Sequence, residues 1–224
     1  LNPLTRVGDQ VAESLVLHRE MNWTEARTEA VRVLTDVGLP NPAQTARSYP
    51  HQLSGGQRQR VVIAIAMACR PKLLIADEPT TALDVTLQSQ ILYLLKQLQE
   101  HHGTSIILVS HNVGVIAACS DQIGVVYAGQ LVEYGPAAEV FRNPKHPYTQ
   151  GLLASLPSTS SDRLSTIAGQ PPDFRTLGGD CPFRPRCPYA FDRCAVRPSL
   201  SPVTPAHLVR CWLAEPAALQ ESGA

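Results

Sequence analysis

The stretch LLIADEPTTALD, residues 73–84, decides the fold prediction. It opens with a short apolar run, which is typical of a β-strand covered on both faces of a sheet. Two adjacent carboxylates, Asp77 and Glu78, follow directly, at the end of the strand where α/β sheets bind ligands. Because paired anions repel each other and resist desolvation, the pair predicts Mg²⁺ at Asp77, with Glu78 left to polarise a water. The simpler alternative is a solvated acidic turn.

Helical and strand patterns alternate around this stretch. Asp84 is suited to cap a helix that ends at Gly103, and a second buried strand is predicted over 106–109, followed by a hairpin that turns at 128–129. Upstream, a helix capped by Thr24 is expected to end at Gly38. Strands that alternate with helices imply an α/β fold with a largely parallel sheet.

His111 directly follows the second predicted strand, in the stretch IILVSHN, residues 106–112. Parallel strands end at the same edge of a sheet, so we expect His111 to lie beside Asp77 and Glu78. A histidine there can hydrogen-bond a phosphate oxygen or an attacking water. A single histidine can also be incidental, and its place after the neighbouring strand is what favours a functional role.

The stretch LSGGQRQR, residues 53–60, places two glycines at the start of a predicted helix. Each glycine costs roughly 1 kcal/mol relative to alanine inside a helix. A turn followed by a serine cap is one explanation. The other is a bound phosphate, because the amides at a helix N-terminus attract negative charge. Gly55 and Gly56 then allow close approach of the backbone, and the Ser54 hydroxyl adds a donor.

In this order and spacing, LSGGQ, LLIADEPTTALD and SHN resemble the motifs of ABC-type ATPases. The resemblance implies that the signature motif contacts the γ-phosphate of ATP held by the opposite subunit. This motif consists of Ser54, Gly55, Gly56 and Gln57. It also implies that Asp77 is the Walker B residue, which supports Mg²⁺ through water, and that Glu78 is the general base. By the same resemblance, His111 is the switch histidine that senses γ-phosphate, and Asp84 is a D-loop residue. Asp84 can cap a helix as well.

The resemblance further implies a partial P-loop NTPase (RecA-like) core with a helical signature subdomain and a small cysteine-containing extension. The expected parts are a helical subdomain over 1–58, the C-terminal part of the catalytic subdomain over 59–140 and the extension over 141–224. The phosphate-cradling pattern G-x-x-x-x-G-K-[ST] does not occur in the sequence. We therefore expect a C-terminal fragment that lacks the Walker A region and does not hydrolyse ATP alone.

Beyond the core, NPKHPYTQGLLASLP, residues 143–157, resembles the ATPases of oligopeptide, dipeptide and nickel importers, and residues 69–86 resemble their D-type subunit. This implies ATP hydrolysis coupled to uptake of peptides or a related solute, at the cytoplasmic face of the membrane as a peripheral subunit. The implied partners are a homologous F-type ATPase subunit, two membrane permeases and, indirectly, an extracytoplasmic solute-binding protein. The alternatives are a non-transport ABC ATPase of DNA repair or ribosomes, and a truncated subunit without turnover.

Four of the six cysteines lie in the proline-rich tail, at Cys181, Cys187, Cys194 and Cys211. A cytosolic compartment disfavours disulfides, so the four thiols suggest zinc or an iron–sulfur cluster. Their spacing does not match the C-x2-4-C pairs of structural zinc sites. The resemblance to D-type importer tails implies a [4Fe–4S] cluster, while Zn²⁺ and unliganded buried cysteines remain alternatives.

Charge and hydropathy argue against binding to nucleic acid and against a membrane-spanning helix. Lysine and arginine number 19, as do aspartate and glutamate, so the chain has no net charge to attract nucleic acid. Three arginines lie among aromatic residues in the tail, but they are too few to predict binding to nucleic acid. The longest apolar run, residues 61–69, is far shorter than the roughly 20 residues that a membrane-spanning helix needs.

Overall fold

The computed structural model describes residues 1–81, 83–156 and 166–215. The chain divides into two compact units, residues 1–112 and 113–224, and each is described separately. The division into parts at 58 and 140 remains a prediction. Within the described residues, no helix has both the length and the apolar character needed to cross a bilayer.

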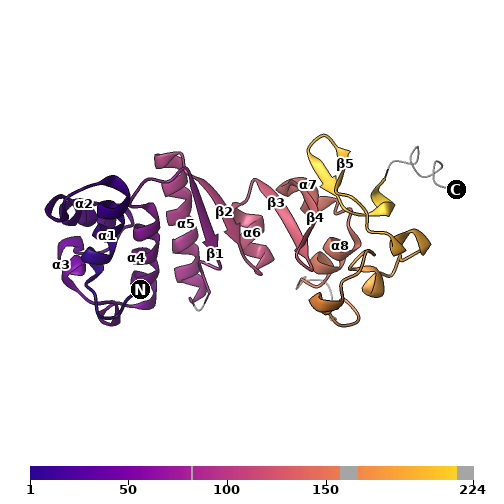
Figure 1. Ribbon diagram of the computed structural model, residues 1–224, viewed down its shortest axis with the longest axis horizontal. Helices are drawn as coiled ribbons and strands as arrows, with labels where there is room; N and C mark the ends of the chain where they lie inside the picture. The colour runs from indigo at the N-terminus through magenta and orange to yellow at the C-terminus, as the bar shows by residue number, and fades with distance from the viewer. Residues whose placement is uncertain (82, 157–165, 216–224) are drawn as a thin grey trace. The chain divides into compact units, whose positions relative to one another are not determined.

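The first unit begins with a group of helices, drawn from indigo to magenta in Figure 1. They are α1 (Val7–Arg19), α2 (Trp23–Asp36), α3 (Pro42–Arg47), the 3-10 turn η1 (Pro50–Gln52) and α4 (Gly55–Met67). The expected cap of α2 was wrong. Asn22, not Thr24, is the N-cap, because its side chain accepts hydrogen bonds from the amides of Thr24 (3.1 Å) and Glu25 (3.0 Å).

The rest of the first unit is a parallel strand pair with a long helix. Strand β1 (Leu73–Asp77) pairs with β2 (Ser105–Val109), and α5 (Val85–His102) connects them. The helix begins and ends as predicted, with an Asp84 cap and Gly103 in the left-handed region at φ 65°. The register sets Asp77 opposite Val109, so both strands end at one edge.

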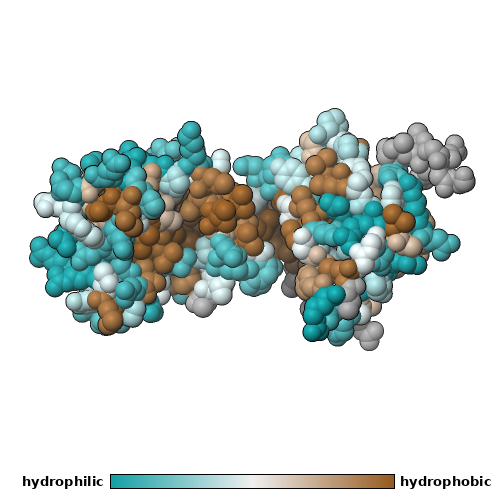
Figure 2. Space-filling view, viewed as in Figure 1, coloured by the Kyte–Doolittle hydropathy of each residue, from teal (hydrophilic) through white to brown (hydrophobic). Residues whose placement is uncertain are grey.

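Only one face of this strand pair is covered by the described residues. Leu74 and Ala76 are buried in a core with Ile91 and Leu95 of α5. The opposite face is apolar and about half exposed, with Leu73 (48%), Ile75 (65%), Ile107 (49%) and Val109 (47%). Figure 2 shows hydrophobic residues gathered over the region where Figure 1 draws β1 and β2. The prediction of two fully buried strands is therefore wrong for the part of the chain that is described.

The second unit contains an antiparallel sheet. It starts with α6 (Val113–Cys119), the hairpin strands β3 (Gln122–Tyr127) and β4 (Gln130–Pro136), α7 (Ala137–Arg142) and α8 (Pro147–Ala154). The hairpin turns where the sequence predicted, with Ala128 at φ 48° and Gly129 at φ 73°. Within residues 1–81, 83–156 and 166–215, parallel pairing is thus limited to β1 and β2.

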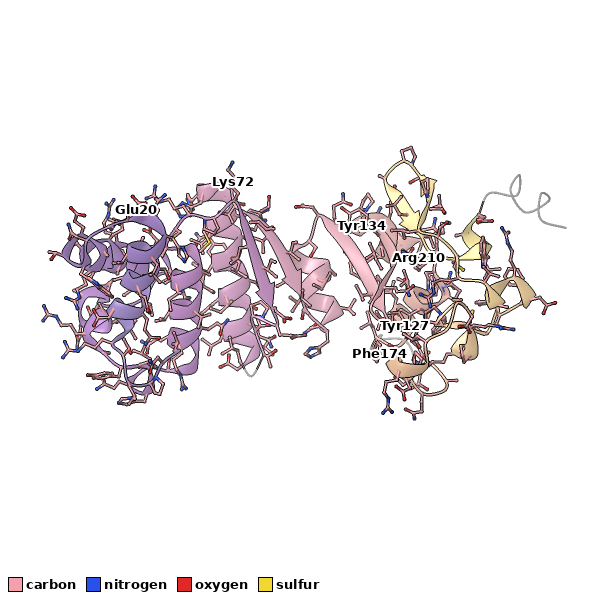
Figure 3. The ribbon with its side chains drawn as sticks, viewed as in Figure 1. Glu20, Lys72, Tyr127, Tyr134, Phe174 and Arg210 are labelled. Carbon is pink, nitrogen blue, oxygen red and sulfur yellow. The ribbon has the colours of Figure 1, made fainter. Side chains whose placement is uncertain are left out.

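The tail supplies two strands that the sequence analysis did not predict. Strands β5 (Ser201–Thr204) and β6 (His207–Val209) complete a sheet of order β3-β4-β6-β5. Short 3-10 turns make up most of the remaining regular structure: η2 (Phe174–Thr176), η3 (Arg184–Arg186), η4 (Asp192–Ala195) and η5 (Trp212–Ala214). Tyr127, labelled in Figure 3, joins tail and sheet, because its ring centroid lies 4.6 Å from that of Tyr148 and 5.2 Å from that of Phe183.

Candidate functional site

Three of the predicted polar residues come together at the carboxyl edge of β1 and β2. Asp77 is the last residue of β1 and is exposed, and Glu78 follows it. His111 lies two residues beyond the end of β2. The Nδ1 atom of His111 is 2.7 Å from Oε1 of Glu78, and its backbone amide donates to the same oxygen at 2.9 Å.

The position of Glu78 depends on an unusual backbone conformation. Its φ is 47°, in the left-handed region that costs a non-glycine residue roughly 1–2 kcal/mol. The Glu78 amide donates to the carbonyl of Val109 at 2.9 Å, which continues the hydrogen bonding of β1 to β2 by one residue. The chain then turns through Pro79, which is buried. The strand pair therefore fixes the carboxylate at its edge.

The carboxylate of Glu78 is held in its charged form. The hydrogen bond from the His111 ring is the largest cause that lowers the pKa of Glu78, and the hydroxyl of Thr81 and the amide of His111 act in the same direction against desolvation. Since an ionised carboxylate only accepts hydrogen bonds, Nδ1 of His111 must carry the hydrogen. The other ring nitrogen, Nε2, is left for an external group, and the side chain is 82% exposed.

The signature residues form the first turn of α4. Ser54 is the N-cap: its Oγ accepts from the amide of Gln57 (3.3 Å), and Oε1 of Gln57 accepts from the amide of Ser54 (3.0 Å). This capping box uses the Gln57 side chain within its own turn. The amides of Gly55 and Gly56 precede the first intrahelical donor, Arg58, so helix geometry directs them outward.

The two glycines have different surroundings. Gly55 is exposed, and a Cβ atom built on it would lie 3.8 Å from Leu83, an ordinary contact. Gly56 is buried, and its Cβ would lie 3.1 Å from Cδ2 of Leu87. Close packing of α4 on the start of α5 therefore accounts for Gly56. Among the described residues, Gly55 meets no contact as close, which makes it the better candidate for contact with a phosphate.

Asp84 is an N-cap in this structure. Its Oδ1 accepts a hydrogen bond from the amide of Leu87 at 2.8 Å and so starts α5. This is the structural role that the sequence allowed, and the D-loop role remains a prediction. Because Leu83 and Leu87 flank Asp84 and approach Gly55 and Gly56, the start of α5 lies against the signature turn.

The four tail cysteines line one pocket in the second unit. Cys181, Cys187, Cys194 and Cys211 share it with His146, Phe183 and Trp212. Two of the cysteines are also joined through the backbone, since the amide of Cys181 donates to the carbonyl of Cys194 at 3.0 Å. These four cysteines are up to 30 positions apart in the sequence, and the fold of the tail brings them to one pocket.

The surroundings of these thiols favour the neutral form. Burial is the main cause that raises the pKa of Cys181, Cys187 and Cys211, the last to about 11. The charges of the other cysteines raise each value further. Within residues 1–81, 83–156 and 166–215, no three histidine, cysteine, aspartate or glutamate side chains are placed to bind one metal ion. The expected iron–sulfur cluster thus has a shared pocket but no assembled ligand group.

Two groups of polar residues were not predicted from the sequence. Thr81 donates its hydroxyl hydrogen to Oε2 of Glu78 at 3.0 Å. In the second unit, the fully buried Glu133 accepts from the amides of Lys145 (2.7 Å) and His146 (3.1 Å), and its Oε1 lies 2.8 Å from Nε2 of His207. A glutamate directly after the apolar pair Leu131 and Val132 was the sequence signal for the second group.

Comparisons with known proteins agree with these motifs. The family model described as ABC transporter matches residues 1–81, and the one described as oligopeptide/dipeptide transporter, C-terminal region, matches residues 132–194. Two solved structures of the bacterial ABC transporter cassette MJ0796 superpose with a TM-score of 0.53. The dimeric form is 34% identical and covers 61% of this chain and 59% of that chain; the other is a post-hydrolysis state bound to ADP and Pi.

Curated relatives extend the match to nearly the whole chain. The oligopeptide transport ATP-binding protein OppD of Salmonella typhimurium is 49% identical over 95% of this chain and 64% of its own length. The dipeptide transport ATP-binding protein DppD of Bacillus subtilis is 46% identical with the same coverage. The chain thus spans slightly less than two thirds of these relatives.

AppD of Bacillus subtilis, an oligopeptide transport ATP-binding protein, is 47% identical over 99% of this chain and 69% of its own length. The match therefore includes both the motif-bearing unit and the tail. The chain belongs to the family of ATP-binding proteins of oligopeptide and dipeptide ABC transporters.

Proposed function

We propose that this chain carries part of the ATP-hydrolysing site of a peptide-type ABC importer. The observation that carries the proposal is the pairing of Glu78 with His111 at the end of the parallel strands, directly after Asp77. The lowered pKa of Glu78 keeps it ionised, as a group that orients and deprotonates a water must be.

The residues at this edge would divide the work of hydrolysis. Asp77 is exposed and offers carboxylate oxygens, which suit Mg²⁺ held through water. Mg²⁺ supplies charge neutralisation on the phosphates during phosphoryl transfer. Glu78 holds the attacking water and takes its proton. His111 would donate a hydrogen bond from Nε2 to the γ-phosphate, which requires that both ring nitrogens carry a hydrogen, because Nδ1 already donates to Glu78.

The signature turn would act on a different nucleotide. The Gly55 amide, the Ser54 hydroxyl hydrogen and the start of α4 together offer donors and partial positive charge to a phosphate. In this proposal they bind the γ-phosphate of ATP held by a second ATPase subunit, of the homologous F-type. Gly56 and Gln57 shape the same turn, and Asp84, as the D-loop residue, acts in communication between the two subunits.

The proposed setting is the cytoplasmic face of the membrane, where the subunit pair binds two permeases and acts indirectly with an extracytoplasmic solute-binding protein. Closure of the pair on ATP drives the permeases, and hydrolysis resets them. The match of residues 132–194 to the peptide-transporter C-terminal model supports an importer over ABC ATPases of DNA repair or ribosomes.

Uptake of a labelled oligopeptide into vesicles tests the proposal, with the full-length subunit assembled with its partner ATPase, permeases and binding protein. We expect Glu78→Gln to abolish ATP-driven uptake. Glu100→Gln is the matched control, because Glu100 is exposed on α5 and should leave uptake unchanged. Uptake by the Glu78→Gln assembly at the normal rate would contradict the proposal.

We also propose that the four cysteines bind a [4Fe–4S] cluster. Their shared pocket supports it, and four cysteine thiolates are the usual ligand set of a [4Fe–4S] cluster. Binding requires that the thiols lose their protons against the pKa shifts described above.

Iron, sulfide and zinc analysis of the anaerobically purified full-length subunit tests this second proposal. We expect iron and sulfide, with visible absorbance that dithionite bleaches and that Cys194→Ser removes. Cys119→Ser is the control, because Cys119 does not line the pocket. Zinc without iron, or neither metal, would contradict the cluster.

A further inference from the structure

Glu78 has a third hydrogen-bond donor besides the two from His111. The backbone turns sharply at Glu78, and the amide of Thr81 donates to the Glu78 carbonyl at 3.2 Å. This turn brings the Thr81 side chain back to the carboxylate, where its Oγ1 lies 3.0 Å from Oε2. Thr81 therefore contacts both the backbone and the side chain of Glu78.

The three donors use the carboxylate unequally. A carboxylate has about four acceptor positions, two on each oxygen. In the structure, Oε1 accepts from both the amide and the ring of His111, and Oε2 accepts from Thr81. Among the described residues, this leaves one acceptor position, on Oε2, for an outside donor. The side chain of Glu78 is 33% exposed, so a water can reach it.

The donors to the two carboxylate oxygens also differ in how they constrain the carboxylate. His111 alone holds one oxygen and would allow the carboxylate plane to rotate about the Cγ–Cδ bond. A second donor on Oε2 stops that rotation, and so fixes the direction of the remaining acceptor. Orientation of this kind matters because a reacting group displaced by a small distance loses much of its rate advantage.

We infer that Thr81 is a positioning residue for Glu78, which directs the one remaining Oε2 acceptor toward the attacking water. The inference rests on the proposed function, in which Glu78 is the general base. Thr81 is itself exposed and adds little to the core. If its hydroxyl only stabilised the turn, its loss would change stability and leave catalysis per folded molecule unchanged.

The test measures ATP hydrolysis by the full-length subunit, assembled with its partner, as kcat and KM for ATP. We expect Thr81→Val to lower kcat about tenfold with KM unchanged, because ATP binding does not need the oriented carboxylate. Thr81→Ser keeps the hydroxyl and should restore kcat to within about twofold of the original. Thr28→Val is the matched control, an exposed threonine of α2 whose hydroxyl donates to the carbonyl of Thr24.

A combined variant separates this inference from the proposed function. If Thr81 acts through Glu78, Thr81→Val should cause no further loss in a Glu78→Gln background. A normal kcat for Thr81→Val, beside a Glu78→Gln variant whose residual kcat is at least about a hundredfold lower, would overturn the positioning role and leave the general base in place. An active Glu78→Gln variant would overturn the proposed function itself. Equal loss in Thr81→Val and Thr81→Ser would also overturn the inference.

Discussion

Replacement of Gly55 by alanine separates the stability of the signature turn from its function. Gly55 is exposed in the first turn of α4, and a methyl group there would meet Leu83 at 3.8 Å, without strain. Alanine is favoured over glycine in a helix by roughly 0.5–1 kcal/mol. We therefore expect Gly55→Ala to raise the free energy of unfolding by up to about 1 kcal/mol, as measured by urea denaturation of this chain.

The same methyl group should impair hydrolysis, because it stands beside the amide that is proposed to bind phosphate. A hydrogen bond to a charged group is worth about 1.5–3 kcal/mol, which corresponds to a loss of about 10–150-fold in ATPase rate. The assay is phosphate release by the full-length subunit, assembled with its partner. A Gly55→Ala variant that loses stability, or that keeps full ATPase activity, would refute this account of the glycine.

Gly56→Ala is the matched comparison within the same turn. Its Cβ would lie 3.1 Å and 3.4 Å from the two terminal methyl groups of Leu87. Crowding of this kind opposes the gain in helix propensity, so we expect Gly56→Ala to be about 1 kcal/mol less stable than Gly55→Ala. Leu87→Ala in the Gly56→Ala background should relieve the crowding and reduce the difference.

Three further predictions concern stability and use urea denaturation. Leu95→Ala removes a buried side chain of α5 and should lower the free energy of unfolding by about 2–5 kcal/mol. Ile75→Ala, on the exposed face of the strand pair, should lower it by less than about 1 kcal/mol. Equal losses would contradict the finding that only one face of β1 and β2 is covered. Asn22→Ala should cost about 1 kcal/mol through loss of the α2 cap, and Thr24→Ala clearly less, so the reverse order would favour the original cap. Glu133→Ala should cost about 3 kcal/mol or more, because it leaves buried donors without an acceptor; a loss below about 1 kcal/mol would contradict that role.

Local signals in the sequence predicted much of the first unit. Ser54 and Asp84 cap their helices through their own side chains, and Gly103 ends α5, because each signal acts within one turn of chain. The cap of α2 was missed because two residues, Asn22 and Thr24, offered similar chemistry. Strands β5 and β6 were missed for another reason: both are short, and they are held by long-range pairing of β6 with β4 that leaves no local pattern.

The site was predictable where strand topology determined it. The shared edge of β1 and β2 was enough to bring Glu78 and His111 together. The contact of Thr81 with Glu78 was not predictable, because it depends on the left-handed φ of Glu78, which turns the chain back on itself. The cysteines were predicted as a group, and their pocket agrees with that, but the assembled ligand geometry that a metal site requires is not present among the described residues.

The most direct measurement is the rate of phosphate release, per bound ATP, by the full-length subunit assembled with its partner, with and without Glu78→Gln. The account predicts that the variant binds Mg²⁺-ATP as tightly as the original and releases phosphate at least a hundredfold more slowly, as expected when a general base is lost. Release at the original rate, with ATP bound equally well, would contradict the claim that the carboxylate at the end of β1 activates the water.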